Sequence, residues 1–264
     1  MSLRRLTPLL LLLASLLHAQ NPAATELRRM PAAEAQQGVT ADARYLYAID
    51  DSEIGKYDKA TGRHIAGWKG DPSVFIHINS CSVINAELVC AMSNFPHLPM
   101  ASSVEWFSTA TMKHLRSHSF GPLGPGSLTW IEWHNGSWYA CFANYDAPRG
   151  DSTRDHNATV LVRYTADFAP KESWLFPRNV LERFGHMSAS GGRFGPGDLL
   201  YVTGHDLPEM YVLRLPNGGQ RLEYLRTITL PTNGQAFDWD YGHAGSVVWT
   251  IERKKAEAVE SKLK

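Results

Sequence analysis

Cysteine is scarce in this chain, with 3 among 264 residues. So few cysteines cannot form the disulfide framework that holds many small secreted domains together. An excess of charge of either sign is also missing, because 26 basic residues balance 26 acidic residues. Nucleic acids and anionic membranes select proteins with a basic face. The charge balance therefore argues against both as partners and leaves a small molecule as the expected ligand.

Short catalytic signatures are absent as well. The sequence has neither the HxH nor the HExxH spacing of zinc ligands. It also lacks the GxSxG turn that presents a nucleophilic serine. Any chemistry must therefore come from residues that the fold brings together, and the sequence requires no cofactor, although a divalent metal is a candidate.

The start of the chain has a pattern of its own. Arg4 and Arg5 precede an apolar run at residues 8–17, and the small residue Ala19 follows. The run is too short for a membrane span, which needs about 20 residues. A basic start, a short apolar run and a small residue are typical of a secretory signal peptide. We therefore expect residues 1–19 to be removed and residues 20–264 to form a single domain, secreted or periplasmic, monomeric and not bound to a membrane.

Two of the cysteines flank a predicted hairpin. If Asn85 and Ala86 form a two-residue turn, Cys81 lies directly opposite Cys90. Cross-strand neighbours are about 4.5–5.5 Å apart at Cα, which a disulfide tolerates. The pair is either bridged or present as two packed thiols, and Cys141 is expected to be unpaired and buried on a strand.

The chain repeats a short apolar β run that ends in a polar pair. Equivalent positions in the five copies are Ile49, Met92, Phe142, Thr203 and Ile251, at spacings of 43, 50, 61 and 48 residues. Periods of this length indicate solenoids or propellers. Each run follows a turn and one short strand, and two further strands come after the first four runs. Five units of four strands predict an all-β fold, a five-bladed β-propeller.

The fifth unit lacks a fourth strand of its own. Residues 25–30 precede the first unit, and we expect them to close the ring as the last strand of the fifth blade. Residues 254–263 favour a helix by residue propensity, whereas the repeat register predicts a strand. We follow the register.

Propeller topology predicts which residues share one face. Loops that follow the second strand of a blade and the starts of the innermost strands meet at the same rim, where a rigid scaffold commonly builds a site. His77, His97, His186 and His205 converge there, whereas His134 and His243 lie in hairpin turns on the opposite face. The predicted ligand-binding residues of the rim are Gln37, His77, Asn79, His97, Ser127, Asn144, Tyr145, Ser190, Gln235 and Arg253.

General acid–base chemistry is the predicted activity of this rim. His205, Asp206 and His186 are the candidate catalytic residues, because a histidine beside a carboxylate can move a proton near neutral pH. Arg253 and Gln235 would hold a carboxylate or an oxyanion. The alternative for Asp206 is a structural role, capping the turn before Pro208.

Other functions remain open. The four rim histidines, with Asp146 or Asp206 as an oxygen ligand, could hold a divalent metal and make the protein a metal-dependent hydrolase. The rim could also bind a ligand or a protein without turnover. A carboxylate glycosidase is disfavoured, because glutamine and serine stand at the inner-strand starts, and Asp42 and Asp240 are predicted turn caps at the far ends.

Several phrases resemble a known family. HINSCSVI, SNFPHLPMASSVEWF, HSFG, SASGGRFG and YVTGHDLPEMYVLRLP resemble a family of secreted bacterial β-propeller proteins that is sometimes labelled cycloisomerase. YVTGHDLPEMYVLRL and GQAFDWD are also similar to phrases in the five-bladed glutaminyl cyclases, from which Asp206 departs. The resemblance implies an exported propeller with a cyclase, isomerase or lyase type of activity, and it assigns no catalytic residues.

Overall fold

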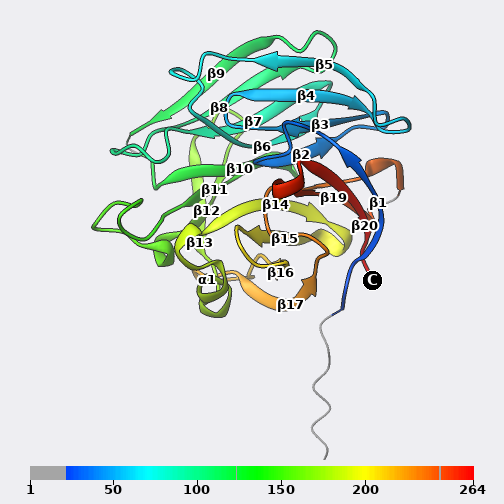
Figure 1. Cartoon of the computed structure of the whole chain (residues 1–264). Coiled ribbons are helices and arrows are strands. Elements are labelled where there is room, and N and C mark those ends of the chain that lie inside the picture. Colours follow the sequence, from blue (N-terminus) through cyan, green and yellow to red (C-terminus); the bar gives the residue numbers. More distant parts are fainter. Residues whose placement is uncertain (1–21, 123, 244) are drawn as a thin grey trace, which may run out of the picture.

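The computed structural model describes residues 22–122, 124–243 and 245–264, and the predicted signal peptide lies outside them. Five antiparallel sheets of four strands each make up the fold, which is the predicted five-bladed β-propeller (Figure 1). The innermost strand of each sheet contacts the innermost strands of its two neighbours, so the five sheets form a ring.

Each blade is described from its innermost to its outermost strand. Blade 1 consists of β2 (Gly38–Ala41), β3 (Tyr45–Ile49), β4 (Glu53–Asp58) and β5 (His64–Lys69), and blade 2 of β6 (His77–Ile84), β7 (Glu87–Ser93), β8 (Ser102–Ser108) and β9 (His114–Gly121). Blade 3 consists of β10 (Ser127–His134), β11 (Ser137–Ala143), β12 (Val160–Tyr164) and β13 (Pro170–Leu175), and blade 4 of β14 (Ala189–Gly195), β15 (Leu199–Gly204), β16 (Glu209–Arg214) and β17 (Glu223–Thr229). Blade 5 consists of β18 (Asp238–Trp239), β19 (Val247–Glu252), β20 (Glu257–Lys262) and β1 (Thr25–Pro31).

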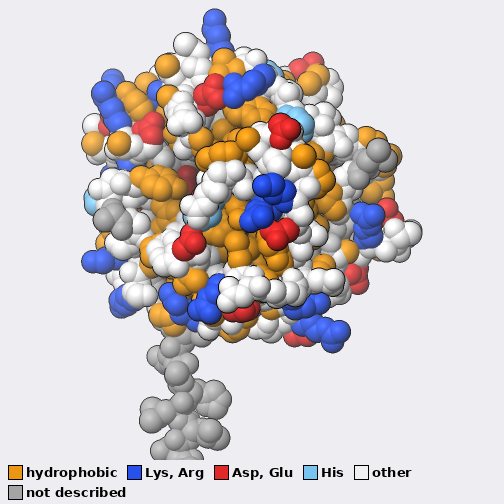
Figure 2. Space-filling view, turned by 180° about the vertical axis from the view of Figure 1, so that it is seen from behind, with side chains coloured by type: hydrophobic (Ala, Val, Ile, Leu, Met, Phe, Trp, Pro, Cys, Tyr) orange, Lys and Arg blue, Asp and Glu red, His pale blue; other side chains and the backbone are white. Residues whose placement is uncertain are grey.

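The helical segments are short. The α-helix α1 spans Arg178–Phe184, and the 3₁₀ turns are η1 (His156–Ala158), η2 (Gly185–Met187), η3 (Pro196–Asp198), η4 (Tyr241–His243) and η5 (Arg253–Lys255). Within the described residues, no helix is both long and apolar enough to cross a membrane. Figure 2 shows one face of the molecule, on which acidic and basic side chains are interspersed among neutral and hydrophobic ones.

The ring closes as predicted, by the first strand pairing with the last. β1 lies antiparallel to β20, with Arg29 opposite Val259 and Met30 opposite Ala258 (Figure 1). Residues 257–262 are therefore a strand, although their propensity favours a helix. Pairing on both edges and the burial of Ala258 and Val259 outweigh that local preference.

The hydrophobic core lies between neighbouring blades, because successive side chains of a strand point to opposite faces of its sheet. In β11, Trp138 and Phe142 pack toward blade 2, in a cluster that includes Val89. The alternate residues Tyr139 and Cys141 pack toward blade 4, in a cluster that includes Phe194. A strand buried on both faces explains why the repeated β runs are apolar throughout rather than alternating.

The hairpin that joins β6 to β7 has the predicted geometry. Asn85 and Ala86 have φ angles of 50° and 63°, the left-handed region that a two-residue hairpin turn requires. Cys81 lies opposite Cys90 and forms a disulfide with it. Cys141 is a free, buried thiol on β11. The sequence allowed either a bridge or two packed thiols for this pair, and the structure has the bridge.

One polar network inside the ring joins all five blades. Arg193 of blade 4, which is 1% exposed, donates from Nε to Asp238 of blade 5 at 3.1 Å and from a terminal nitrogen to the carbonyl of Cys81 in blade 2. Thr40 of blade 1 donates to the other oxygen of Asp238. Glu132 of blade 3 accepts from the backbone N–H of Phe194 at 2.6 Å. The buried cation is thus paired and its neighbours are satisfied, as a buried charge requires.

Burial has a large effect on Glu132. Loss of solvation raises its pKa to about 8, and the nearby Arg193 charge only partly opposes the rise. The carboxyl group is therefore mostly protonated at neutral pH.

Candidate functional site

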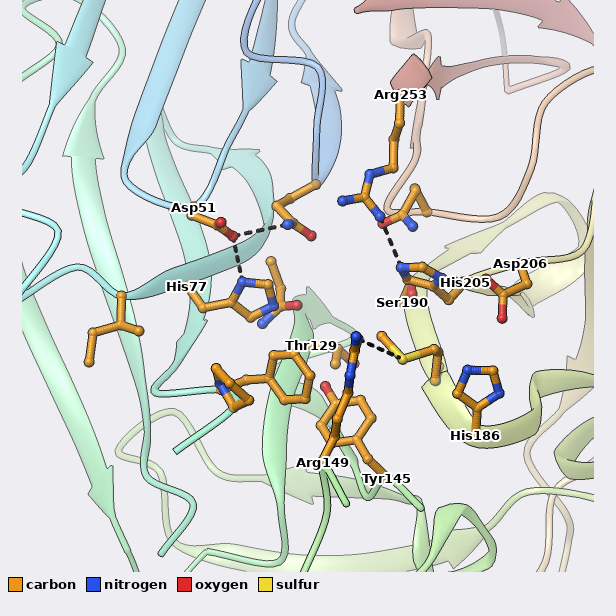
Figure 3. Close-up of a pocket in the computed structure, with 18 residues that line it drawn as sticks. Asp51, His77, Thr129, Tyr145, Arg149, His186, Ser190, His205, Asp206 and Arg253 are labelled. Atoms are coloured by element: carbon orange, nitrogen blue, oxygen red, sulfur yellow. Dashed lines mark hydrogen bonds and ion pairs between the residues drawn. The ribbon is translucent and has the colours of Figure 1, made fainter. Parts of the chain in front are cut away.

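A cavity of about 630 Å³ opens where the rim loops surround the centre of the ring. Its lining includes residues from every blade, and Figure 3 shows them arranged around a common space. A volume of this size lies within the range of ordinary small-molecule sites, about 300–1,000 Å³. The lining residues are Gln37, Asp51, Ile76, His77, Asn79, Phe95, Pro96, Thr129, Tyr145, Arg149, His186, Met187, Ala189, Ser190, His205, Asp206, Gln235 and Arg253.

Most of the residues predicted for the rim meet in this cavity. The three candidate catalytic residues His186, His205 and Asp206 all line it. So do the predicted binding residues Gln37, His77, Asn79, Tyr145, Ser190, Gln235 and Arg253. The structure thus places these residues around one cavity, while their binding and chemical roles remain predictions.

Three predicted residues do not line the cavity. His97 lies exposed at the tip of the loop between β7 and β8. Ser127 is buried and donates to the hydroxyl of Ser93 at 2.8 Å. The side-chain amide of Asn144 donates to the backbone carbonyls of Pro125 and Ala158, at 2.9 and 3.0 Å. Ser127 and Asn144 thus satisfy polar groups between elements, which is a structural task that a sequence pattern cannot distinguish from ligand binding.

Other lining residues were not predicted. Asp51 follows the apolar run of the first repeat, just as Asp206 follows the apolar run of the fourth repeat. The alignment of the repeats could therefore have identified Asp51 as a rim residue. Phe95 belongs to the loop between β7 and β8, and Arg149 to the long segment between β11 and β12. The direction of a side chain in such a loop depends on tertiary packing, and no periodicity reveals it.

A hydrogen-bonded group joins the first two blades at the rim. Asp51 Oδ1 accepts from Nε2 of Gln37 at 2.9 Å and lies 2.5 Å from Nδ1 of His77 (Figure 3). The carboxylate of Asp51 is therefore already hydrogen-bonded to Gln37 and His77.

His205 is held on both sides of its ring. Nδ1 lies 2.6 Å from Oδ1 of Asp206, and Nε2 lies 2.9 Å from Nη1 of Arg253 (Figure 3). A guanidinium can only donate, so Nε2 must be the accepting, unprotonated nitrogen, and Nδ1 carries the proton that Asp206 accepts. Burial lowers the pKa of His205, and the hydrogen bond to Asp206 opposes that effect only in part. The imidazole is thus held neutral, with a defined tautomer.

Two guanidinium groups reach into the cavity without an acidic partner. Within the described residues, neither Arg253 nor Arg149 forms a salt bridge with a carboxylate; Arg149 contacts the sulfur of Met187 at 3.6 Å. Figure 3 shows the two side chains extending toward the centre of the cavity from opposite sides. The acidic lining residues Asp51 and Asp206 are each paired with a histidine instead. The cavity therefore has cationic groups to offer an anion.

Gln235 adds an unpartnered donor. The residue is 5% exposed and lines the cavity, and its Nε2 has no hydrogen-bond partner in the described part of the chain. A buried amide nitrogen without a partner costs free energy, which a ligand oxygen could offset. A smaller cavity of about 360 Å³ adjoins this point and shares His205, Asp206, Gln235 and Arg253 with the larger one.

An aromatic wall forms another part of the lining. The ring of Phe95 lies 4.5 Å from the ring of Tyr145 and 5.3 Å from that of His77. Burial raises the pKa of Tyr145 to about 12, so its hydroxyl is neutral over the physiological range.

In the described part of the chain, the rim histidines belong to no group of three residues with the geometry of a metal site. The groups with suitable geometry in residues 22–122, 124–243 and 245–264 are Asp146 with Asp155 and His156, and Asp240 with His243 and Glu260. Neither contains His77, His97, His186 or His205. Asp146, the proposed oxygen ligand, pairs with His156 at 2.7 Å, and Asp240 pairs with Lys59 at 3.0 Å.

The fold defines the chain as a β-propeller, and comparison with solved structures agrees. The chain is similar to a luciferin-regenerating enzyme, with 10% identity, 92% of this chain and 95% of that chain covered, and a TM-score of 0.51. It is also similar to streptogramin B lyase (12% identity, 91% and 97% covered, TM-score 0.48) and to a chain of the mitotic checkpoint complex (8% identity, 99% and 99% covered, TM-score 0.49). At such identities the likeness concerns the fold alone. No protein-family model and no curated protein matches the sequence.

Proposed function

We propose that this propeller binds a small carboxylate in the rim cavity and that His205 moves a proton on the bound molecule, as a cyclase, isomerase or lyase would. The resemblance to propellers labelled cycloisomerase and to the glutaminyl cyclases motivates this reaction class. We further propose that residues 1–19 direct export, so that the protein works in a secreted or periplasmic setting. The Cys81–Cys90 disulfide supports export, because such bonds persist in oxidising compartments.

The observation that carries the proposal is a pair of guanidinium groups, Arg149 and Arg253, that face one cavity and have no acidic partner among the described residues. Arginine matches the geometry of a carboxylate, which it binds through two parallel N–H···O bonds. The unpartnered amide of Gln235 supplies a further donor beside Arg253.

The reaction step follows from the tautomer of His205. In the free protein Arg253 occupies the lone pair of Nε2. A ligand carboxylate that draws Arg253 to itself frees this lone pair, and Nε2 can then take a proton from the ligand. The bonding electrons stay on the ligand, where they form a new bond or expel a leaving group. Asp206 stabilises the resulting imidazolium, and His205 then returns the proton to the ligand or to the leaving group, while His186 lines the same cavity.

Binding is tested first, by titration calorimetry with a panel of small carboxylates and their amides. We expect the carboxylates to bind and Arg253→Gln to weaken them by about tenfold or more, since a hydrogen bond to a charged group contributes about 1.5–3 kcal/mol. Lys255→Gln is the matched control, because Lys255 is exposed in the same turn η5 and lines neither cavity. Equal affinity of wild type and Arg253→Gln would count against the proposal.

Turnover separates an enzyme from a binding protein. For a carboxylate that is converted, His205→Ala should lower the rate by about 10²–10⁴-fold, the contribution of a general base. His134→Ala should leave the rate unchanged, because His134 bonds Asp198 and stacks on Phe194 away from the rim cavity. If a bound carboxylate is never converted, or if both variants behave alike, the protein is a binder and not an enzyme.

A further inference from the structure

The lining of the rim cavity divides into two chemically different parts. One part is polar and contains Arg253, Gln235 and the His205–Asp206 pair. The other is mainly apolar and contains Phe95, Tyr145 and Met187, with the guanidinium of Arg149 against the Met187 sulfur at 3.6 Å. A ligand that fills both parts must itself have two unlike ends.

The apolar part is built mainly from flat rings. Phe95 stands between Tyr145 and His77, at ring-centre distances of 4.5 and 5.3 Å and interplanar angles of 50° and 40°. Aromatic groups prefer to meet other aromatic rings in offset or edge-on arrangements at such distances. A flat, unsaturated body would therefore gain more from this wall than an aliphatic body of equal size.

The loop that presents Phe95 is braced by its own hydrogen bonds. Asn94 accepts from the N–H of Ala101 at 2.8 Å and donates to the carbonyl of Pro99 at 3.0 Å, which ties the two ends of the loop together. The backbone N–H of Phe95 also donates to Ser93 at 3.4 Å. A wall that is ordered before binding gives a ligand its contacts at a lower entropic cost.

From this division we infer that the ligand is a flat aromatic or conjugated carboxylate, with its carboxylate at Arg253 and its planar body against Phe95 and Tyr145. This inference rests on the proposed carboxylate site and adds the chemical class of the body. The cavity of about 630 Å³ has room for one ring and a short chain.

The test compares benzoate with cyclohexanecarboxylate, acetate and benzamide, by titration calorimetry on the full mature chain. We expect benzoate to bind about threefold to tenfold more tightly than cyclohexanecarboxylate, from the typical strength of aromatic pairs. Phe95→Leu should remove that preference while cyclohexanecarboxylate binding changes less than about twofold, because leucine keeps the apolar volume but not the flat face. Phe95→Trp should keep the preference.

Leu98→Ala is the matched control, since Leu98 lies in the same loop and outside the cavity lining, with 51% of its surface exposed. It should behave as the wild type, and circular dichroism verifies that each variant folds. If cyclohexanecarboxylate binds as tightly as benzoate, or if Phe95→Leu keeps the preference, the aromatic inference is wrong while the carboxylate site stands. If benzamide equals benzoate, or no carboxylate binds, both the inference and the proposed function are wrong.

Discussion

Nη1 of Arg253 lies 2.9 Å from Nε2 of His205, so an arginine occupies the lone pair of the histidine that the sequence nominates as a base. The arrangement keeps the imidazole neutral and aligned, with Asp206 on its other nitrogen. It also couples two events, because a carboxylate that recruits Arg253 exposes the basic nitrogen at the same time. Binding and proton transfer are thereby linked through one side chain.

This coupling predicts proton uptake on binding. The pKa of His205 is lowered in the free protein, and it should rise when Arg253 turns to a carboxylate, because a cation leaves and an anion arrives. Binding then takes up protons, so affinity should increase as the pH falls from 8 toward 6. Calorimetry in two buffers of different ionisation enthalpy measures the uptake. His205→Asn should abolish it and His186→Gln should retain most of it; a pH-independent affinity in the wild type would contradict the coupling.

Glu132 predicts a second pH effect, on stability. Its folded-state pKa, about 8, lies above the value of 4.5 that it has when solvated. Its stabilising contribution is thus fully present below pH 4.5 and is lost as the pH rises through 8. Glu132→Gln keeps a neutral acceptor for the N–H of Phe194. Denaturant unfolding should show the variant gaining more than about 1 kcal/mol relative to wild type between pH 5 and pH 8, since one pKa unit corresponds to about 1.4 kcal/mol. A constant difference would refute the pKa shift.

The closing strand predicts the cost of a truncation. Deleting residues 22–31 removes β1 and leaves β20 with an open edge and the neighbouring core exposed. The midpoint of thermal unfolding should fall by about 10 °C or more, because each kcal/mol shifts a domain of this size by about 2–4 °C. Removal of the exposed Lys264 alone is the control. Similar midpoints for both deletions, followed by circular dichroism, would be incompatible with closure by β1.

The disulfide predicts a specific peptide map. Protein produced in an oxidising compartment and digested without reduction should contain one Cys81–Cys90 cross-linked peptide, with Cys141 free. The stabilisation should stay below about 3 kcal/mol, the value for a loop of 15 residues, because the loop here is shorter. Alkylation of all three thiols before reduction would show that the bridge does not form.

The sequence predicts the fold better than the site, for physical reasons. The ring follows from a repeated strand pattern, and the assignment of residues 257–262 to a strand follows from the repeat register against local propensity. The rim face follows from topology alone. By contrast, His97 was placed in the site from its neighbourhood in sequence, but the loop turns its side chain outward. Arg149 was missed for the same reason, because loop side chains take their direction from tertiary contacts.

Small polar residues set a further limit on how much of the site can be predicted from the sequence. Ser127 and Gln235 occupy equivalent places in the repeat, yet Ser127 bonds Ser93 whereas Gln235 has a free amide in the cavity. The difference arises from what the neighbouring blade offers each side chain, and this information is not local to either segment.

The pairing of β1 with β20 also dictates when the molecule can be finished. Arg29 donates to Glu257, 228 positions further along the chain, so a nascent chain holds β1 unpartnered until β20 has been translated. Ring completion is thus tied to the synthesis of β20, and a chain that stalls before it is left with an unpaired seam. Such a seam exposes an unpaired strand edge, so the junction of β1 with β20 distinguishes a closed ring from an incomplete one.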